Sequence, residues 1–196
     1  MSRTIACVTS LGFAAAWCFG FLVALSGIAS APVAAALAPA KADGPAPAFS
    51  LARLDGKPVT SKSLGGKVVL LDLWASWCAP CIASMPAIAK LQRDYGHKGL
   101  VVLGVTFDDD NAKLNAFLAR RSPGVTVVRP NAAFNREYGT LLHVKHNVLV
   151  TPDKLIQANL PTWILIDRKG RIAAIHPSST QEKQMLAEAA ALASRS

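Results

Sequence analysis

The sequence predicts an α/β domain in which a β-sheet of mixed direction is covered by helices on both faces. Two continuous apolar runs of strand length, KVVLLDLW at 67–74 and LVVLGVT at 100–106, are typical of buried central strands. Each run is followed by a segment in which apolar residues recur at helical spacing. A predicted hairpin and a final helix complete the chain, and this alternation of strands and helices predicts the fold class.

An apolar leader precedes the domain. Residues 1–40 contain one charged residue, Arg3, whereas 41–196 carry 20 basic and 12 acidic residues, a net charge of +8. The apolar stretch at 5–29 exceeds the ~7–15 residues of a signal-peptide core and reaches the ~20 residues of a membrane span. We therefore expect either a cleaved export signal, with a cleavage site such as 38–40, or an uncleaved inner-membrane anchor. Either one places the domain outside the cytoplasm, which in a bacterium is the periplasm.

The remaining chain divides into a linker at 41–48, rich in Ala and Pro, and one domain at 49–196. This composition excludes a disordered chain, a low-complexity protein and a multi-span membrane protein. At the start of the domain, 49–54 and 57–60 flank Asp55-Gly56 and predict a short N-terminal β-hairpin.

The other elements follow in order along the domain. Apolar spacing and turn residues predict helices at 80–95, 111–121 and 132–138, and strands at 125–128, 163–167 and 171–175. The last two strands form a hairpin across Arg168-Lys169-Gly170. Ser179 or Thr180 is expected to cap a final helix that ends near 193.

The domain contains two cysteines, Cys78 and Cys81, because Cys7 and Cys18 lie in the leader. They lie in the segment WCAPC at 77–81, where a buried strand is expected to end and a helix to begin. The unsatisfied N–H groups of a helix N-terminus stabilise a thiolate, so the pKa of Cys78 should be lowered and its sulfur reactive. Cys81, one turn later, is placed to resolve a mixed disulfide.

Three other interpretations of the cysteine pair compete with a redox centre. A structural disulfide that closes a four-residue loop contributes only ~2 kcal/mol. A zinc knuckle needs two further soft ligands, and the domain has no other cysteine. Two unrelated core cysteines would leave the strand-to-helix placement unexplained. The redox pair is therefore the leading interpretation.

At these residues the domain resembles the thioredoxin fold and, more narrowly, the TlpA/ResA-like family of exported thiol-disulfide oxidoreductases. The resemblance extends over about 45–195 and depends on three stretches: 49–57, KVVLLDLWASWCAPC at 67–81, and LPTWILIDRKGRI at 160–172. It implies a thioredoxin-like fold with a central mixed sheet, an N-terminal β-hairpin extension and an insert before a cis-proline loop.

The resemblance also implies the substrate-binding residues. Pro161 would follow a cis peptide bond in a loop that faces the cysteine pair, and the backbone of Leu160 would pair with an extended substrate segment. With Trp77 and Thr162, these two residues make up the expected substrate-binding set. From the residues alone, Leu160-Pro161 is an X-Pro loop before a strand, in which cis is the minority form.

Asp72 interrupts the apolar strand six residues before Cys78. A carboxylate in a buried strand should have a raised pKa. Thioredoxins similarly place a buried Asp here, and we assign Asp72 to the deprotonation of Cys81; the alternative is a solvated Asp at a strand edge. Similar family members often carry a Glu three residues after the second cysteine, where this chain has Ser84. Chemistry attributed to that Glu therefore does not transfer.

An insert at 140–159 separates the predicted helix at 132–138 from Leu160. Because it leads into the proline loop, we expect it to shape partner choice; the alternative is a surface hairpin without a role. A deletion that impairs the native partner but not general disulfide reduction would distinguish the two. The insert contains His143 and His146. Their imidazole groups, together with a pair of cysteine thiolates, are suitable ligands for a copper ion. The competing function is therefore a copper-binding module or metallochaperone built on Cys78, Cys81 and one of these histidines.

The sequence thus favours an enzyme, an envelope thiol-disulfide oxidoreductase that cycles Cys78 and Cys81 and acts as a reductant. By resemblance, its substrates are disulfides in exported proteins, such as apocytochrome c or copper-site assembly proteins, and a membrane thiol carrier supplies electrons. This interpretation requires no cofactor and no metal. Scattered Lys and Arg without interleaved aromatic residues argue against nucleic acid as a partner. We expect a monomer.

Overall fold

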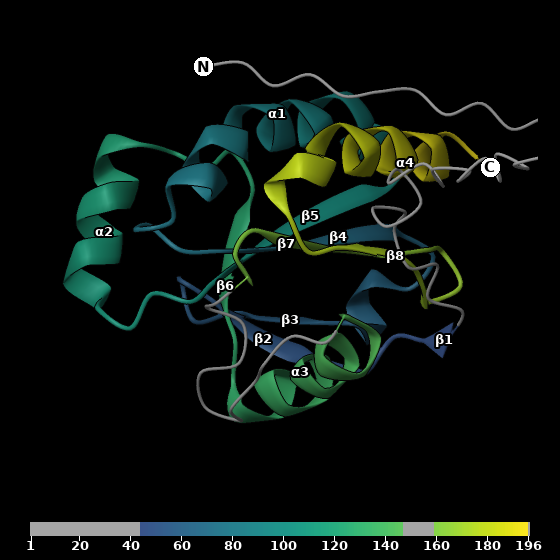
Figure 1. Cartoon of the computed structure of the whole chain (residues 1–196), viewed down its shortest axis with the longest axis horizontal. Helices are drawn as coiled ribbons and strands as arrows, with labels where there is room; N and C mark the ends of the chain where they lie inside the picture. The colour runs from purple at the N-terminus through teal and green to yellow at the C-terminus, as the bar shows by residue number, and fades with distance from the viewer. Residues whose placement is uncertain (1–43, 147–158, 196) are drawn as a thin grey trace, which may run out of the picture. The chain divides into compact units, whose positions relative to one another are not determined.

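The architecture is one mixed β-sheet with helices on its two faces (Figure 1). This computed structural model describes residues 44–195 except 147–158, and leaves out the side chains of 143–146. The strands are β1 (Gly44–Pro45), β2 (Ser50–Arg53), β3 (Pro58–Thr60), β4 (Val68–Trp74), β5 (Leu100–Thr106), β6 (Thr126–Arg129), β7 (Thr162–Ile166) and β8 (Arg171–His176). The α-helices are α1 (Ala79–Tyr95), α2 (Asn111–Arg120), α3 (Ala132–His146) and α4 (Glu182–Ser194). Short 3₁₀ turns are η2 (Lys62–Leu64), η3 (Gly96–Lys98) and η5 (Ser179–Gln181).

The strand order in the sheet is β1-β8-β7-β4-β5-β6-β2-β3. β5 pairs in parallel with β4 and with β6, and the other neighbours are antiparallel. β4 is flanked on both sides, and all seven of its residues are buried. The continuous apolar runs therefore form the centre of the sheet, as a strand covered on both faces requires.

Alternation along β4 divides the core between the two faces of the sheet. Val68 and Leu70 pack in a cluster with Ile88 of α1 and Met185 of α4. The intervening residues, such as Leu71, point to the opposite face and pack with the aromatic residues of α3. Figure 1 shows the same division, with α1 and α4 on one side of the sheet and α3 on the other.

Most predicted elements agree with the observed ones within two residues, including the N-terminal hairpin of β2 and β3. Two helices differ. α3 continues beyond the predicted 132–138 to His146, because Leu141 and Leu142 extend its apolar side into the core. The last helix does not start at a cap on Ser179 or Thr180. Instead, the Ser178 hydroxyl caps the 3₁₀ turn η5, which leads into α4.

The predicted leader at 1–40 lies outside the described residues, and its division from the linker and the domain remains a prediction. Gly44 and Pro45, within the expected linker at 41–48, pair with Ile172 and Arg171 of β8. Within the part of the chain that the structure describes, no helix has the length and apolarity that a bilayer crossing requires. The backbone of His143 and His146 ends α3, and their side chains also lie outside the description.

Candidate redox site

The cysteine pair lies where β4 leads into α1. Cys78 is the N-cap of α1, with an extended backbone (φ −87°, ψ 99°), and Pro80 lies in the first turn. The Cys81 N–H points at Cys78 Sγ over 3.3 Å, so this sulfur accepts from one of the donors that a helix start leaves unpaired. The Cys78 N–H donates to the Ala75 carbonyl at 3.1 Å, which closes the turn before the helix. Local sequence signals therefore predicted the placement of the pair correctly.

Cys78 and Cys81 form a disulfide with Cα atoms 5.3 Å apart. Both are buried, with 6% and 2% of their surface exposed, and they pack in a cluster with Trp74, Met85 and other apolar residues. Trp77, next to Cys78, is 56% exposed. A large aromatic side chain on the surface beside a disulfide is suited to contact another protein.

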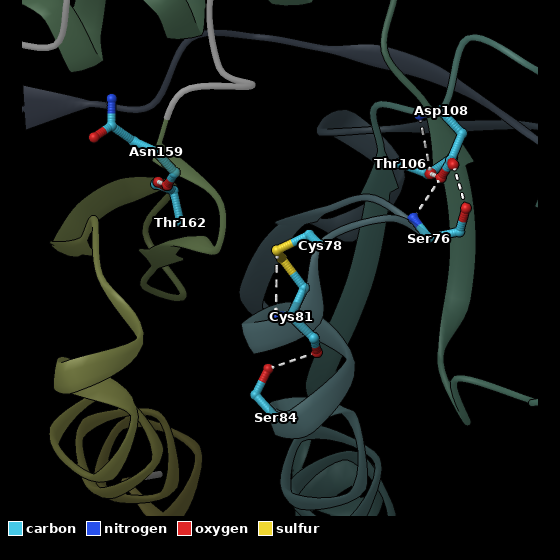
Figure 2. The surroundings of a disulfide bond; sticks show 8 residues. All are labelled: Ser76, Cys78, Cys81, Ser84, Thr106, Asp108, Asn159 and Thr162. Atoms are coloured by element: carbon cyan, nitrogen blue, oxygen red, sulfur yellow. Dashed lines mark hydrogen bonds between the residues drawn. A yellow bond between two sulfur atoms is a disulfide. The ribbon is translucent and has the colours of Figure 1, made fainter.

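The loop before β7 faces the disulfide. The Leu160–Pro161 peptide bond is cis, as the resemblance implied. Leu160 packs against the apolar cluster that contains both cysteines, and the Thr162 hydroxyl donates to the Asn159 carbonyl at 2.7 Å. Figure 2 shows Asn159 and Thr162 opposite the cysteine pair. The fold thus brings together two segments that are about 80 residues apart in sequence.

Asp72 lies in the middle of β4 and is 4% exposed, so the alternative of a solvated strand-edge Asp is excluded. It is on the face of the sheet that α1 and α4 cover, two residues before Trp74 of the cysteine cluster. Burial raises the pKa of Asp72 to about 7. The indole N–H of Trp163 on β7 partly opposes this rise without forming a well-aligned hydrogen bond.

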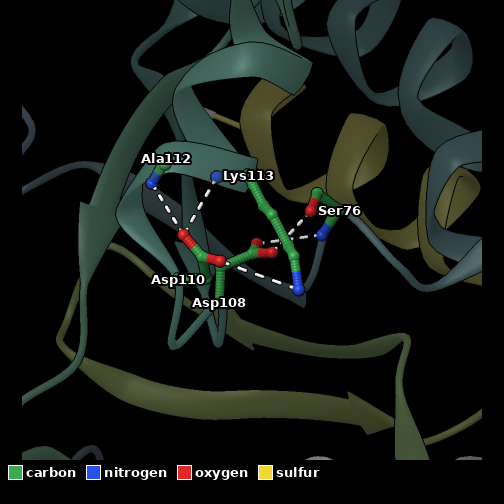
Figure 3. A network of polar contacts seen from close by, with 5 residues as sticks. All are labelled: Ser76, Asp108, Asp110, Ala112 and Lys113. Atoms are coloured by element: carbon green, nitrogen blue, oxygen red, sulfur yellow. Dashed lines mark hydrogen bonds and ion pairs between the residues drawn. The ribbon is translucent and has the colours of Figure 1, made fainter.

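A second buried carboxylate, Asp108, which the sequence did not predict as part of the site, holds the loop before Cys78. Its Oδ2 accepts from the Ser76 N–H at 2.9 Å and from the Thr106 hydroxyl at 2.6 Å. Its Oδ1 accepts from the Ser76 hydroxyl at 2.5 Å (Figures 2 and 3). Parallel neighbours β4 and β5 end at the same edge of the sheet, and this common edge was the available signal.

Ser84, which replaces the Glu of similar family members, is fully buried in α1. Its hydroxyl donates to the Cys81 carbonyl at 2.9 Å, one turn earlier in the helix (Figure 2). This bond satisfies the hydroxyl within the helix. Among residues with described side chains, no three His, Cys, Asp or Glu groups are placed to share a metal ion. The copper alternative also involves His143 and His146, so it remains a prediction.

Comparison with known proteins indicates thiol-disulfide chemistry. The family model described as Redoxin matches residues 41–192. The thioredoxin-like protein YneN of Bacillus subtilis (strain 168) is 31% identical over 143 residues, which span 71% of this chain and 74% of YneN. The thiol-disulfide oxidoreductase ResA of Bacillus thuringiensis (strain Al Hakam) is 28% identical, over 65% of this chain and 64% of ResA. The thiol:disulfide interchange protein DsbE of Pseudomonas fluorescens biotype C is 40% identical over 76 residues, 38% of this chain and 40% of DsbE.

Solved structures give the same fold. A Chlorobium tepidum protein assigned as the thiol:disulfide interchange protein DsbE is 30% identical, with a TM-score of 0.56, over 76% of this chain and 96% of that one. A thioredoxin-family thiol:disulfide interchange protein from Chlorobium tepidum TLS has a TM-score of 0.59 at 21% identity, over 76% of this chain and 97% of that one. The second likeness shows the fold alone. Together with the sequence relatives, these structures confirm the predicted thioredoxin-like fold.

Proposed function

This chain belongs to the Redoxin family and is a thiol-disulfide oxidoreductase, and we propose that it reduces disulfides in exported proteins by cycling Cys78 and Cys81 between dithiol and disulfide. One observation carries the proposal. The Cys78–Cys81 disulfide caps α1 directly opposite the cis-proline loop, beside an exposed tryptophan. A reactive sulfur at a helix N-terminus, next to a surface for another chain, suits disulfide exchange.

The reaction begins from the reduced pair. The Cys78 thiolate attacks one sulfur of the substrate disulfide, so that a bond forms between enzyme and substrate and the second substrate sulfur leaves as a thiolate. Cys81 then loses its proton and attacks Cys78 Sγ. This step closes the Cys78–Cys81 disulfide and releases the first substrate sulfur. Two electrons pass from the enzyme to the substrate, and a thiol donor must return them.

Asp72 is the proposed proton acceptor for Cys81. It is buried on the face of the sheet that α1 and α4 cover. Its raised pKa of about 7 is suited to taking and releasing a proton near neutral pH. Trp77, Leu160, Pro161 and Thr162 are the proposed substrate-binding residues. The exposed indole of Trp77 would contact the substrate, while the backbone of Leu160 would pair with its extended segment.

The proposed direction is reduction, and the proposed compartment is the periplasm, with the domain either free or tethered through 5–29. Ala79-Pro80 lacks the His next to the second cysteine that strong oxidants carry, and apolar Leu160 resembles the reducing thioredoxins. The proposed substrates are apocytochrome c or copper-site assembly proteins, with a membrane thiol carrier as electron donor. The insert at 140–159 is the proposed determinant of partner choice.

The test is a trapping experiment in the native envelope with Cys81→Ala. Without the resolving thiol, the mixed disulfide at Cys78 should persist, and non-reducing electrophoresis with mass spectrometry should identify exported proteins attached to Cys78. Cys78→Ala is the control and should trap none of them. A measured reduction potential near that of reducing thioredoxins, about −270 mV, would support the direction.

Two results would contradict the proposal. A potential near −120 mV would make the protein an oxidant. Equal recovery of proteins with Cys81→Ala and with Cys78→Ala would show that Cys78 is not the attacking sulfur. Tight copper binding by the reduced protein without insulin-reductase activity would instead favour the metallochaperone.

A further inference from the structure

A row of buried polar atoms crosses the sheet next to Asp72. The cross-strand partner of Asp72 on β7 is Trp163, and the partner of Trp163 on β8 is His176. All three are on the face of the sheet that α1 and α4 cover, and Trp163 and His176 have no exposed surface. Neighbouring strands lie roughly 4.8 Å apart, so the row extends about 10 Å from Asp72 to His176.

Each member of this row has a polar atom without a hydrogen-bond partner among the described residues: Asp72 Oδ1, Trp163 Nε1 and His176 Nδ1. Leaving such an atom unpaired costs roughly 1–3 kcal/mol, so buried groups of this kind require a specific explanation. Three of them in consecutive register positions indicate one shared polar site within the core.

The environment on the β5 side of Asp72 differs. There its partner is Gly104, which has no side chain. The indole Nε1 of Trp74 lies over Gly104, 3.0 Å from the position that a Cβ would occupy, and it too is buried with no hydrogen-bond partner in the described part of the chain. Asp72 therefore lies between two indole N–H donors, and the row extends from it across β7 toward His176.

The far end of the row reaches the surface. His176 Nε2 is 3.1 Å from Glu188 Oε2 on α4, and the Glu188 side chain is 34% exposed. Because a carboxylate can only accept, His176 Nε2 carries the hydrogen, and in the neutral ring Nδ1 is then an acceptor facing away from Glu188. Burial lowers the pKa of His176 and favours this neutral form, while Glu188 opposes the shift.

The donors and acceptors of the row match one another. Trp163 within the row and Trp74 beside Asp72 provide N–H donors, and Asp72 and His176 provide acceptors. A buried water needs two to four such partners. The buried residues that α1 and α4 place on this face include one further titratable group, Cys81. Among the described residues, the partly exposed Glu188 is the charged side chain bonded to the row.

We propose that this row is a hydrated proton route, through which the proton that Asp72 takes from Cys81 leaves to solvent by way of His176 and Glu188. The inference rests on the role proposed for Asp72. As Cys81 attacks Cys78, the Asp72 carboxylate takes the thiol proton and in the same step passes a proton along bound water to His176 Nδ1. His176 passes a proton from Nε2 to Glu188, which releases it. Trp163 keeps its own hydrogen and orients the water.

The test is a single turnover of the reduced full-length protein with glutathione disulfide, in which release of the second glutathione reports the attack by Cys81. We expect His176→Gln and Glu188→Gln to slow this second step by about tenfold, the factor that corresponds to roughly one hydrogen bond. The solvent deuterium isotope effect on the step should rise. The first step and the reduction potential should stay unchanged, since a proton route alters a rate and not an equilibrium.

Two further variants separate the possible failures. Glu182→Gln, on the same helix but without a bond to His176, should leave both steps unchanged. Asp72→Asn should slow the second step by about a hundredfold. If Asp72→Asn slows it and both His176→Gln and Glu188→Gln do not, the route is wrong and the role of Asp72 stands. If Asp72→Asn has no effect, both proposals fail.

A measurement on the unmodified protein keeps the proposal testable if His176→Gln does not fold. In the folded wild-type protein, NMR should show magnetisation transfer from water to the indole N–H of Trp163 despite its complete burial. A dry core around Trp163, with no such transfer, would overturn the proposal.

Discussion

At the scale of single residues, Asp72 is the least expected occupant of its position. A carboxyl group in the centre of a seven-residue buried strand lowers stability whenever it is ionised, because burial disfavours the charged form more than the Trp163 indole N–H stabilises it. Such a residue is suited to chemistry rather than to packing. Its cost should therefore appear as a pH-dependent loss of stability.

We predict that Asp72→Asn removes most of this pH dependence. The carboxyl group titrates near 3.8 when unfolded and near 7 when folded, so between these pH values the folded protein holds a proton that the unfolded chain has lost. The free energy of unfolding of the wild type should therefore fall by about 2–3 kcal/mol from pH 5 to pH 8 through this group. Asn cannot titrate, and urea unfolding of the oxidised protein at both pH values should show a smaller fall.

Asp110 provides the matched control. It is exposed at the N-cap of α2, and its pKa is lowered, chiefly by the hydrogen bond from the Lys113 N–H. A lowered pKa stabilises the fold above about pH 4 and loses this contribution as the pH falls further. Asp110→Asn should therefore leave the change between pH 5 and pH 8 intact. Parallel curves for wild type and Asp72→Asn would contradict the raised pKa.

At the scale of elements, the segment between β4 and α1 is held by Asp108 at the end of β5. Three hydrogen bonds from Ser76 and Thr106 reach its carboxylate, and two of them come from Ser76, two residues before Cys78. On the other side, the Arg129 guanidinium donates to the Asp108 carbonyl at 3.1 Å and also bonds the side chain of Asn111. This network joins the loop to β5, β6 and α2.

We predict that Asp108→Asn lowers the free energy of unfolding by about 2 kcal/mol, because hydrogen bonds to a charged acceptor are the stronger kind. Ser76→Ala should cost about 1 kcal/mol, since the backbone N–H keeps its bond. Asp110 lies beside Asp108 in Figure 3. Asp110→Asn should leave the free energy of unfolding almost unchanged, because Asn is an equally good N-cap.

The double variant Ser76→Ala/Asp108→Asn measures the coupling of the two side chains. In urea unfolding at pH 7, its free energy of unfolding should fall by less than the sum of the decreases for the two single variants. Additive losses would show that Asp108 does not act through Ser76.

At the scale of the whole molecule, Arg168 joins segments that are distant in sequence. Its guanidinium donates to the carbonyls of Gly66 and Lys98, and to those of Ala193 and Arg195 at the end of α4. A cation at the C-terminal ends of helices is also favoured by their dipoles. The turn before β4, the turn before β5 and the last helix are thus fastened together at this side chain.

We predict that Arg168→Ala lowers the free energy of unfolding by about 2 kcal/mol, because several carbonyl groups lose their donor. Arg168→Lys should recover only part of the loss, since one ammonium cannot reproduce the planar fork. Lys169→Ala is the control: Lys169 is exposed, and the one hydrogen bond it donates to Asp167 comes from its backbone. If Arg168→Ala and Lys169→Ala unfold at the same urea concentration, the fastening contributes nothing.

Local patterns in the sequence were sufficient for the central strands, for the start of α1 at Cys78 and for the burial of Asp72. Each depends on the spacing of apolar residues or on an end signal within a few positions. The cis bond before Pro161 came from family resemblance, since the residues alone favour trans. The extension of α3 was missed because Leu142 becomes a helical core residue only when the opposite face of the sheet is present.

The remaining features depend on which strands become neighbours and in what register. Asp108 meets Ser76 because β4 and β5 end at the same edge, and Asp72, Trp163 and His176 form a row because β4, β7 and β8 are adjacent. The contacts of Ser76 with Asp108 and of Asp72 with Trp163 join residues 32 and 91 positions apart, over which the local pattern places no constraint. The local sequence was thus sufficient to identify Cys78 and Cys81 as the redox pair. Only the tertiary structure brings together the polar groups that we propose control the proton of Cys81.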